Sequence, residues 1–223
     1  MLLFAAMPDL LRSAVALVRR GVVFELRLYR SLFRWVARRT HGLAPGVEPF
    51  GYARAVTPVM WLWIFGSALE VFFLDLVIPW QPVRVVAFVL GAWGFVWMVG
   101  LLASLKVYPH LMSDAGLRLR YGASVDVTVP WQAVETITVD RRDLPSSVRT
   151  LQPVETARGT DLQIAVSGQV NVHAALRRPL TVPTPKGDRV VTGLTFLTDD
   201  PRALVTRARA HLPSRPGRPT GRG

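Results

Sequence analysis

The chain has 223 residues, of which 50% are apolar, and it carries a formal net charge of +12. It has no cysteine, which excludes disulfide frameworks, thiolate metal sites and thiol catalysis. The apolar residues concentrate in the middle of the chain, unlike those of an ordinary globular protein. Nine arginines against three acidic residues precede this apolar centre, in residues 1–54. These features favour a membrane protein with one modest soluble domain.

Residues 10–39 are predicted to form one basic amphipathic helix within an N-terminal region of residues 1–41. At 100° per residue, its arginines fall within an arc of about 100°, and aliphatic and aromatic residues occupy much of the rest. Such a helix can lie in the headgroup plane of an anionic leaflet. Packing on the soluble domain with a solvated arginine face is the alternative, and the broad apolar arc disfavours nucleic-acid binding. The expected membrane-surface residues are Arg19, Arg20, Arg27, Arg30, Arg34 and Arg38.

A linker is expected at residues 42–54, followed by a transmembrane hairpin at residues 55–106. Its two apolar runs are Ala55–Ile78 and Val85–Leu105, and the second has 21 residues without a charge. That length crosses about 30 Å of hydrocarbon, and the short connection forces the helices to be antiparallel. Small residues in the second run are predicted to pack between the two helices, with homodimerisation as the alternative: Ala87, Gly91, Gly94, Gly100 and Ser104.

The distribution of arginine predicts the orientation of this hairpin. Nine arginines precede the first run, whereas only Arg84 lies at the turn and Lys106 follows the second run. Because cytoplasmic flanks are enriched in basic residues, both termini are expected to be cytoplasmic, in an inner-membrane protein with two spans. The first residues do not fit a cleavable signal peptide, because Asp9 and Arg12 interrupt the apolar stretch.

Two acidic residues lie inside the first apolar run. Glu70 is about 12 Å from the outer end of its span, a depth at which an ionisable group suggests a proton relay, an ion path or a substrate contact. The favoured interpretation is a carboxyl group facing the neighbouring helix, with Arg84 as a partner. Asp75 is close enough to the headgroups to need no special account.

From residue 107 to residue 213 the pattern alternates with period two, which predicts strands. A polar loop is expected at Arg141–Thr160, and a closing helix follows Asp199 and Asp200, with Pro201 in its first turn. The predicted fold class is a membrane α-helical hairpin plus an α+β domain, a small β-barrel capped by a C-terminal helix. Residues 214–223 are expected to form a disordered basic tail. The predicted strands are Leu117–Tyr121, Val125–Val129, Val134–Val139, Leu162–Val166, Val170–Leu176, Leu180–Val182 and Val190–Leu197.

The stretch from Tyr108 to Gly122, with Asp114-Ala115-Gly116-Leu117 at its centre, is followed by Val129-Pro130-Trp131. This run resembles bacterial pleckstrin-homology-like domain membrane proteins of the actinobacterial type, over about residues 56–212. The resemblance implies a PH-like barrel that acts as a scaffold or binding module, and a phosphoinositide site in eukaryotic relatives of the fold. The lysine-rich signature of that site is absent. Four arginines could meet anionic headgroups, although solvated strand faces are the favoured interpretation: Arg118, Arg120, Arg141 and Arg142.

No catalytic constellation is recognisable in the sequence. The four histidines are scattered, and Asp199-Asp200 is better explained as a helix cap than as a carboxylate pair. We therefore expect a non-enzymatic membrane protein without metal or cofactor, whose cytoplasmic domain binds a partner protein or anionic lipid. Its expected partners are the bilayer, anionic headgroups, an unidentified protein and a second copy of itself, and not nucleic acid. The alternative function is a subunit of an oligomeric transporter or channel, with Glu70 lining the path.

Overall fold

The computed structural model describes residues 2–144, 150–184 and 187–212, except the side chains of residues 2–14, 16 and 20. The chain divides into two compact units. The first comprises Met1–Gly42, Arg54–Pro109 and Arg120–Ser124, and the second comprises Leu43–Ala53, His110–Leu119 and Val125–Gly223. Each unit is therefore assembled from segments that are far apart in the sequence. The expected basic tail at residues 214–223 lies outside the described residues.

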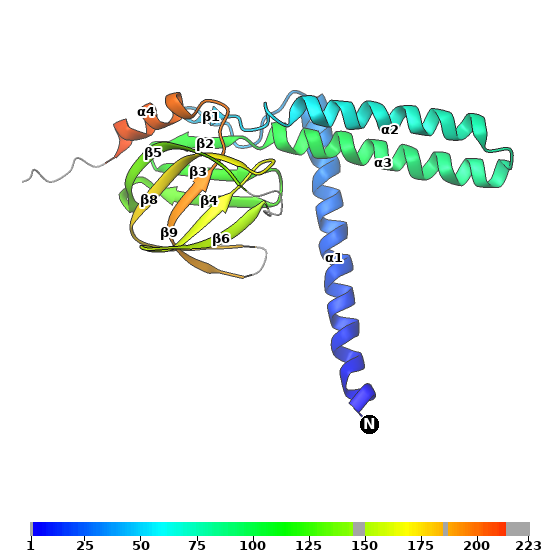
Figure 1. Cartoon of the computed structure of the whole chain (residues 1–223), viewed down its shortest axis with the longest axis horizontal. Helices are drawn as coiled ribbons and strands as arrows, with labels where there is room; N and C mark the ends of the chain where they lie inside the picture. Colours follow the sequence, from blue (N-terminus) through cyan, green and yellow to red (C-terminus); the bar gives the residue numbers. More distant parts are fainter. Residues whose placement is uncertain (1, 145–149, 185–186, 213–223) are drawn as a thin grey trace, which may run out of the picture. The chain divides into compact units, whose positions relative to one another are not determined.

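Three helices build the first unit: α1 (Leu2–Val36), α2 (Thr57–Val77) and α3 (Gln81–Val107). The apolar windows of α2 and α3 are only 6% and 11% buried, and both helices are long and apolar enough to cross a membrane. This exposure distinguishes them from the core helices of a soluble protein, which hide their apolar side chains. In Figure 1 α2 and α3 lie side by side, joined by a short turn.

Packing between α2 and α3 follows a stripe along α2 in which every third or fourth residue is shielded from solvent. Opposite this stripe, a β-carbon at Gly91 would lie 2.5 Å from Cγ2 of Val71. The prediction that small residues pack within the hairpin is confirmed at this position. Gly94, in contrast, has open space around it. The stripe consists of Met60, Ile64, Ser67, Val71 and Leu74.

The helix α1 begins earlier and ends earlier than predicted. Its last turn closes with hydrogen bonds from the Arg38 amide to the Trp35 carbonyl (2.9 Å) and from the Arg39 amide to the Arg34 carbonyl (2.8 Å). This is the Schellman arrangement, which needs a left-handed residue just past the helix. Arg38 takes that place with φ of 53°, so the helix stops at Val36 although no glycine marks its end.

The second unit contains two sheets. Strands β1 (Glu48–Phe50), β2 (His110–Ser113), β3 (Gly116–Tyr121) and β4 (Val125–Pro130) form the first, in that order. The second sheet has the order β5-β8-β9-β7-β6. Its strands are antiparallel except for the parallel pair β7 and β9. They span Val134–Asp143 (β5), Leu151–Thr156 (β6), Gly159–Ile164 (β7), Gln169–Val182 (β8) and Arg189–Phe196 (β9).

Several predicted boundaries differ from these strands. Residues 42–54 were expected to be a linker, but β1 pairs with β2 and Tyr52 is fully buried against His110, with ring centroids 4.7 Å apart. Much of the predicted loop Arg141–Thr160 is strand, because β5 extends to Asp143 and β6 pairs with β7. The two predicted strands before residue 183 are one strand, β8, which passes Pro179 at a shift in its register with β9.

The short 3-10 turn η1 (Trp131–Ala133) and the helix α4 (Pro201–His211) complete the second unit. The Asp200 side chain accepts from the Ala203 amide at 3.0 Å and caps α4 as predicted. The helix buries Leu204, Val205 and Ala208, and it packs on β5 and β8. The α+β class is thus observed, but the described strands form two separate sheets and no single closed barrel.

Candidate functional site

The helix α1 packs on α3 through one face of its C-terminal half. Leu28 is buried against Gly100, where a β-carbon would lie 2.9 Å from Cγ of Leu28. Phe24 contacts Trp97 with ring centroids 6.4 Å apart. Figure 1 shows α1 running across α3 rather than along it. Its two remaining sides therefore face opposite ends of the hairpin.

The side of α1 that faces the α2–α3 turn carries a polar triad. One carboxylate oxygen of Glu25 accepts from the Tyr29 hydroxyl (2.7 Å) and from the Trp93 indole nitrogen (2.8 Å). The same indole nitrogen lies 2.9 Å from the Tyr29 hydroxyl oxygen. The hydrogen bond to Glu25 raises the pKa of the Tyr29 phenol. Glu25 was not among the predicted site residues, although its spacing of four residues from Tyr29 is a recognisable helical pair.

The opposite side of α1 carries arginines that form hydrogen bonds near the C-terminal end of α3. Arg34 donates to the Tyr108 hydroxyl at 2.9 Å, and Arg27 donates to the Ala123 carbonyl at 3.3 Å. Arg19 and Arg30 are exposed, and the side chain of Arg20 lies outside the described residues. Arg38, also predicted to lie on the helical arginine arc, is instead in the turn that ends α1.

One stripe of apolar side chains on α1 is not covered by any other described residue. Its members recur at three- and four-residue spacing on the turn-facing side, next to Tyr29, and Phe33 is 75% exposed. The helix therefore has three chemically distinct faces: one packed on α3, one basic, and one apolar and exposed. The stripe comprises Val15, Val18, Val22, Leu26 and Phe33.

The two acidic residues of α2 lie in different surroundings. Glu70 is exposed beside the stripe that packs on α3, and within the described part of the chain it has no hydrogen bond or ion pair. The predicted partnership with Arg84 is wrong, because Arg84 lies 3.5 Å from the Asp75 carboxylate. Asp75 and Arg84 sit at the facing ends of two antiparallel helices, which explains why they meet.

The four arginines predicted as a ligand face are not brought together. Arg118 forms two 2.6 Å hydrogen bonds with Asp126, which raise the pKa of its guanidinium group. Arg120, expected on the same exposed face, is 1% exposed and donates to the His41 carbonyl at 2.9 Å. Arg141 and Arg142 belong to β5 of the other sheet, where Arg142 pairs with Asp140 at 2.7 Å.

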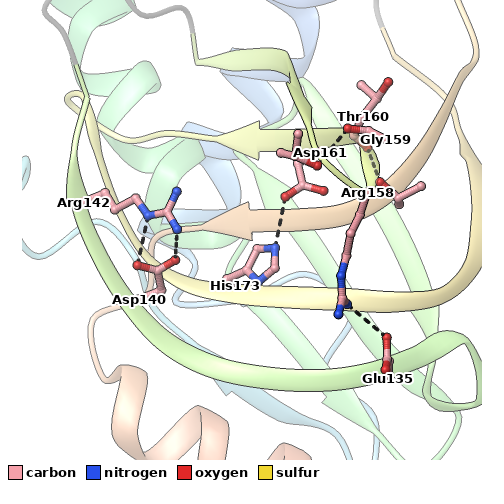
Figure 2. A network of polar contacts seen from close by, with 10 residues as sticks. Glu135, Asp140, Arg142, Arg158, Gly159, Thr160, Asp161 and His173 are labelled. Atoms are coloured by element: carbon pink, nitrogen blue, oxygen red, sulfur yellow. Dashed lines mark hydrogen bonds and ion pairs between the residues drawn. The ribbon is translucent and has the colours of Figure 1, made fainter.

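A polar network covers one face of the five-stranded sheet (Figure 2). His173 on β8 meets Asp161 on β7 at 3.1 Å, across the intervening strand β9. Gly193 of β9 makes this possible, because a β-carbon there would collide with the Asp161 carboxylate. Arg158, before β7, reaches Glu135 of β5 at 3.4 Å. These two residues come from opposite edges of the strand order, so the sheet is strongly curled.

This network has only part of what hydrolytic catalysis needs. An aspartate that orients a histidine is one half of a catalytic triad, and the other half is a nucleophile hydrogen-bonded to that histidine. Among the described residues, His173 has Asp161 as its one hydrogen-bond partner. In the same residues, no three His, Asp or Glu side chains converge on a point that could hold a metal ion.

Comparisons with family models, with curated proteins and with solved structures found no match to this chain.

Proposed function

We propose that this chain is an integral membrane protein in which α2 and α3 form an anchor, α1 lies in the cytoplasmic leaflet, and the β-rich unit is a non-catalytic binding module. The observation that carries the proposal is the sidedness of α1 where it crosses α3. Its exposed apolar stripe lies on the side facing the hairpin turn, and Arg27 and Arg34 lie on the other side. A helix at a membrane interface needs this division.

The level at which α1 crosses α3 agrees with this placement. Gly100 lies 19 residues after the start of α3 at Gln81, which corresponds to about 28 Å along a helix. The hydrocarbon core of a bilayer is about 30 Å thick. With the hairpin turn at one interface, α1 therefore lies at the other, with its stripe toward the acyl chains. Its arginines then face the anionic headgroups, where each contributes on the order of 1 kcal/mol.

Strand pairing supports two spans with both flanks on one side. β1 precedes the hairpin, β2 follows it, and the two are antiparallel neighbours, with Pro49 opposite Leu111. A sheet cannot form across a bilayer, so both flanks of the hairpin belong to the same compartment. The excess of arginine before α2 favours the cytoplasm for that compartment.

For the β-rich unit we propose a PH-like module that binds a partner protein or anionic lipid. Its support is the resemblance of residues 108–137, the strong curl of the five-stranded sheet, and the closing helix α4 packed on β5 and β8. We propose a binding role rather than catalysis because, among the described residues, no nucleophile is hydrogen-bonded to His173 and no third metal-ligating side chain joins His173 and Asp161.

Cysteine accessibility tests the anchoring and the orientation, because the chain has no native cysteine. Gln81→Cys places a thiol at the hairpin turn, and Ser167→Cys places one in the exposed turn before β8. In intact cells, an impermeant maleimide should label Gln81→Cys only, and Ser167→Cys should react after the cells are opened. Labelling of Ser167→Cys in intact cells would contradict the proposed orientation.

The exposure of Glu70 favours a second candidate function, a subunit of an oligomeric transporter or channel. A carboxyl group about 12 Å from the hairpin turn is costly in lipid, and the Glu70 side chain is exposed. A contact with a neighbouring protomer would remove that cost. Under this function Glu70→Gln and Glu70→Leu both fail to complement a deletion strain while still inserting. Full complementation by both variants would exclude it.

A further inference from the structure

A cavity of about 620 Å³ lies at the C-terminal end of α1, on the boundary between its basic side and its apolar stripe. Its volume falls within the range of about 300–1,000 Å³ that is usual for ligand pockets. Three arginines line it together with apolar and aromatic side chains, and no acidic residue does. The lining residues are Leu26, Tyr29, Arg30, Phe33, Arg34, Ala37, Arg39, Thr40, His41 and Gly42.

The turn that ends α1 builds the second wall of this cavity. Because the backbone of Arg38 has the left-handed conformation, the chain reverses and brings residues 39–42 alongside the last two turns of the helix. The wall is held in place from α3. The His41 amide donates to the Val107 carbonyl at 3.0 Å, and the His41 ring lies edge-on to Tyr108, with centroids 5.1 Å apart.

The cationic groups of the cavity differ in how they are engaged. Arg34 is held by the Tyr108 hydroxyl at 2.9 Å. In the described part of the chain, the guanidinium groups of Arg30 and Arg39 make no hydrogen bond or ion pair. Each presents a planar fork of donors that matches the oxygens of a phosphate group. The cavity therefore contains two guanidinium groups that are available to a ligand, those of Arg30 and Arg39, and a third, that of Arg34, which is fixed in position.

The apolar lining of the cavity indicates which kind of chemical group would be attached to a bound phosphate. Leu26 and Phe33 belong to the exposed apolar stripe, 57% and 75% exposed, and they continue from the cavity onto the side of α1 that faces the hairpin turn. If Arg30 and Arg39 held the phosphate of a lipid, the acyl chain of that lipid would therefore lie along Leu26 and Phe33. We propose that this cavity is a specific site for one anionic phospholipid, with its phosphate on Arg30 and Arg39.

This inference rests on the proposed placement of α1 at the leaflet, but its test does not. The full chain, purified in an uncharged detergent, is titrated with phosphatidylglycerol and with phosphatidylcholine, and bound lipids are counted by native mass spectrometry. We expect one saturable phosphatidylglycerol per chain and no saturable binding of phosphatidylcholine. Several phosphatidylglycerol molecules binding with equal affinity would overturn the proposal.

Substitutions identify the site. Arg30→Gln combined with Arg39→Gln should weaken phosphatidylglycerol binding at least about tenfold, which corresponds to about 1.4 kcal/mol. The control, Arg19→Gln with Arg202→Gln, removes the same charge from two exposed positions outside the cavity and should change affinity less than about twofold. Equal losses in both double variants would overturn the proposal. If the first variant unfolds, Arg30→Lys with Arg39→Lys keeps the charge but loses the fork, and it should still bind more weakly than wild type.

Two further experiments distinguish a bound lipid from a bound free phosphate. Phe33→Asn removes apolar lining without changing charge and should also weaken phosphatidylglycerol binding, whereas Val22→Asn, on the same stripe outside the cavity, should not. Millimolar inorganic phosphate should leave bound lipid in place, and its displacement would assign the cavity to a soluble anion. A chain that labels at Gln81→Cys as expected yet binds no phosphatidylglycerol would overturn this inference alone.

Discussion

Leu28 of α1 lies directly over Gly100 of α3, so close that a β-carbon at Gly100 would come within 2.9 Å of Cγ of Leu28 and 3.2 Å of its Cδ2. Leu28 is 1% exposed, so its side chain is almost fully enclosed at this contact between the two helices. The position of α1 on the hairpin, and with it the sidedness of the arginines, therefore depends on a residue that has no side chain.

Replacing that glycine should release α1 from the hairpin. Gly100→Leu forces Leu28 away, and overpacking of this kind typically costs about 1–3 kcal/mol. Gly94→Leu is the matched control, since nothing lies within 4 Å of a β-carbon there. Hydrogen exchange in detergent should show lost protection in residues 24–35 for Gly100→Leu, with α2 and α3 unchanged. Equal protection of α1 in both variants would contradict the packing described.

Replacing Arg38 with glycine should stabilise the protein. The Arg38 φ of 53° is costly for a residue with a side chain and free for glycine, and position C′ of a Schellman turn is where glycine is usual. Arg38→Gly should raise the free energy of unfolding by about 0.5–1 kcal/mol. Arg19→Gly, inside the same helix, should lower it by a similar amount. Thermal unfolding followed by circular dichroism gives both values, and the same sign for both would refute the assigned turn.

Gly193 should be intolerant of alanine because of Asp161. A β-carbon at Gly193 would collide with the Asp161 carboxylate and break its contact with His173. We expect Gly193→Ala to destabilise the β-rich unit by about 1–3 kcal/mol.

A double-mutant cycle isolates this cause. In an Asp161→Ala background the collision is absent, so Gly193→Ala should cost much less than in the wild-type background. Chemical denaturation monitored at Trp131, which is 2% exposed, reports on this unit. An unchanged cost would mean that the backbone at Gly193, and not Asp161, excludes a side chain.

Arg118 should contribute little to ligand binding. Both its fork and the Asp126 carboxylate are used in their mutual hydrogen bonds, and both side chains are nearly half exposed. Arg118→Gln should therefore leave phosphatidylglycerol affinity unchanged and lower stability by about 1 kcal/mol or less. Lipid titration and denaturation of the same preparation test both parts. A tenfold loss of affinity would instead make the β3–β4 hairpin a ligand face.

The elements predicted well from the sequence are those whose pattern is local. The apolar length of α2 and α3, the 3.6-residue periodicity of α1 and the alternation in β3 and β4 lie within each segment, and each was found. β1 was missed because Glu48-Pro49-Phe50 has no alternation of its own, and its pairing partner β2 lies some 60 residues further on.

Site residues were harder to predict, because distant contacts determine their surroundings. Alternation placed Arg120 beside Arg118, yet Arg120 is 1% exposed and donates to the His41 carbonyl, 79 residues away in sequence. The end of α1 could not be predicted from a turn residue, since an arginine occupies the position where glycine is usual. Glu25 was missed because only the crossing of α1 and α3 brings it to Trp93.

The ladder between β1 and β2 has a consequence for biosynthesis. β1 leaves the ribosome before the hairpin, and it stays unpaired until β2 emerges behind α3. A chain whose hairpin failed to return across the bilayer would hold these two strands in different compartments, and the four-stranded sheet could not form. If α2 and α3 span a bilayer as proposed, the four-stranded sheet can therefore form only in molecules in which both helices have crossed it.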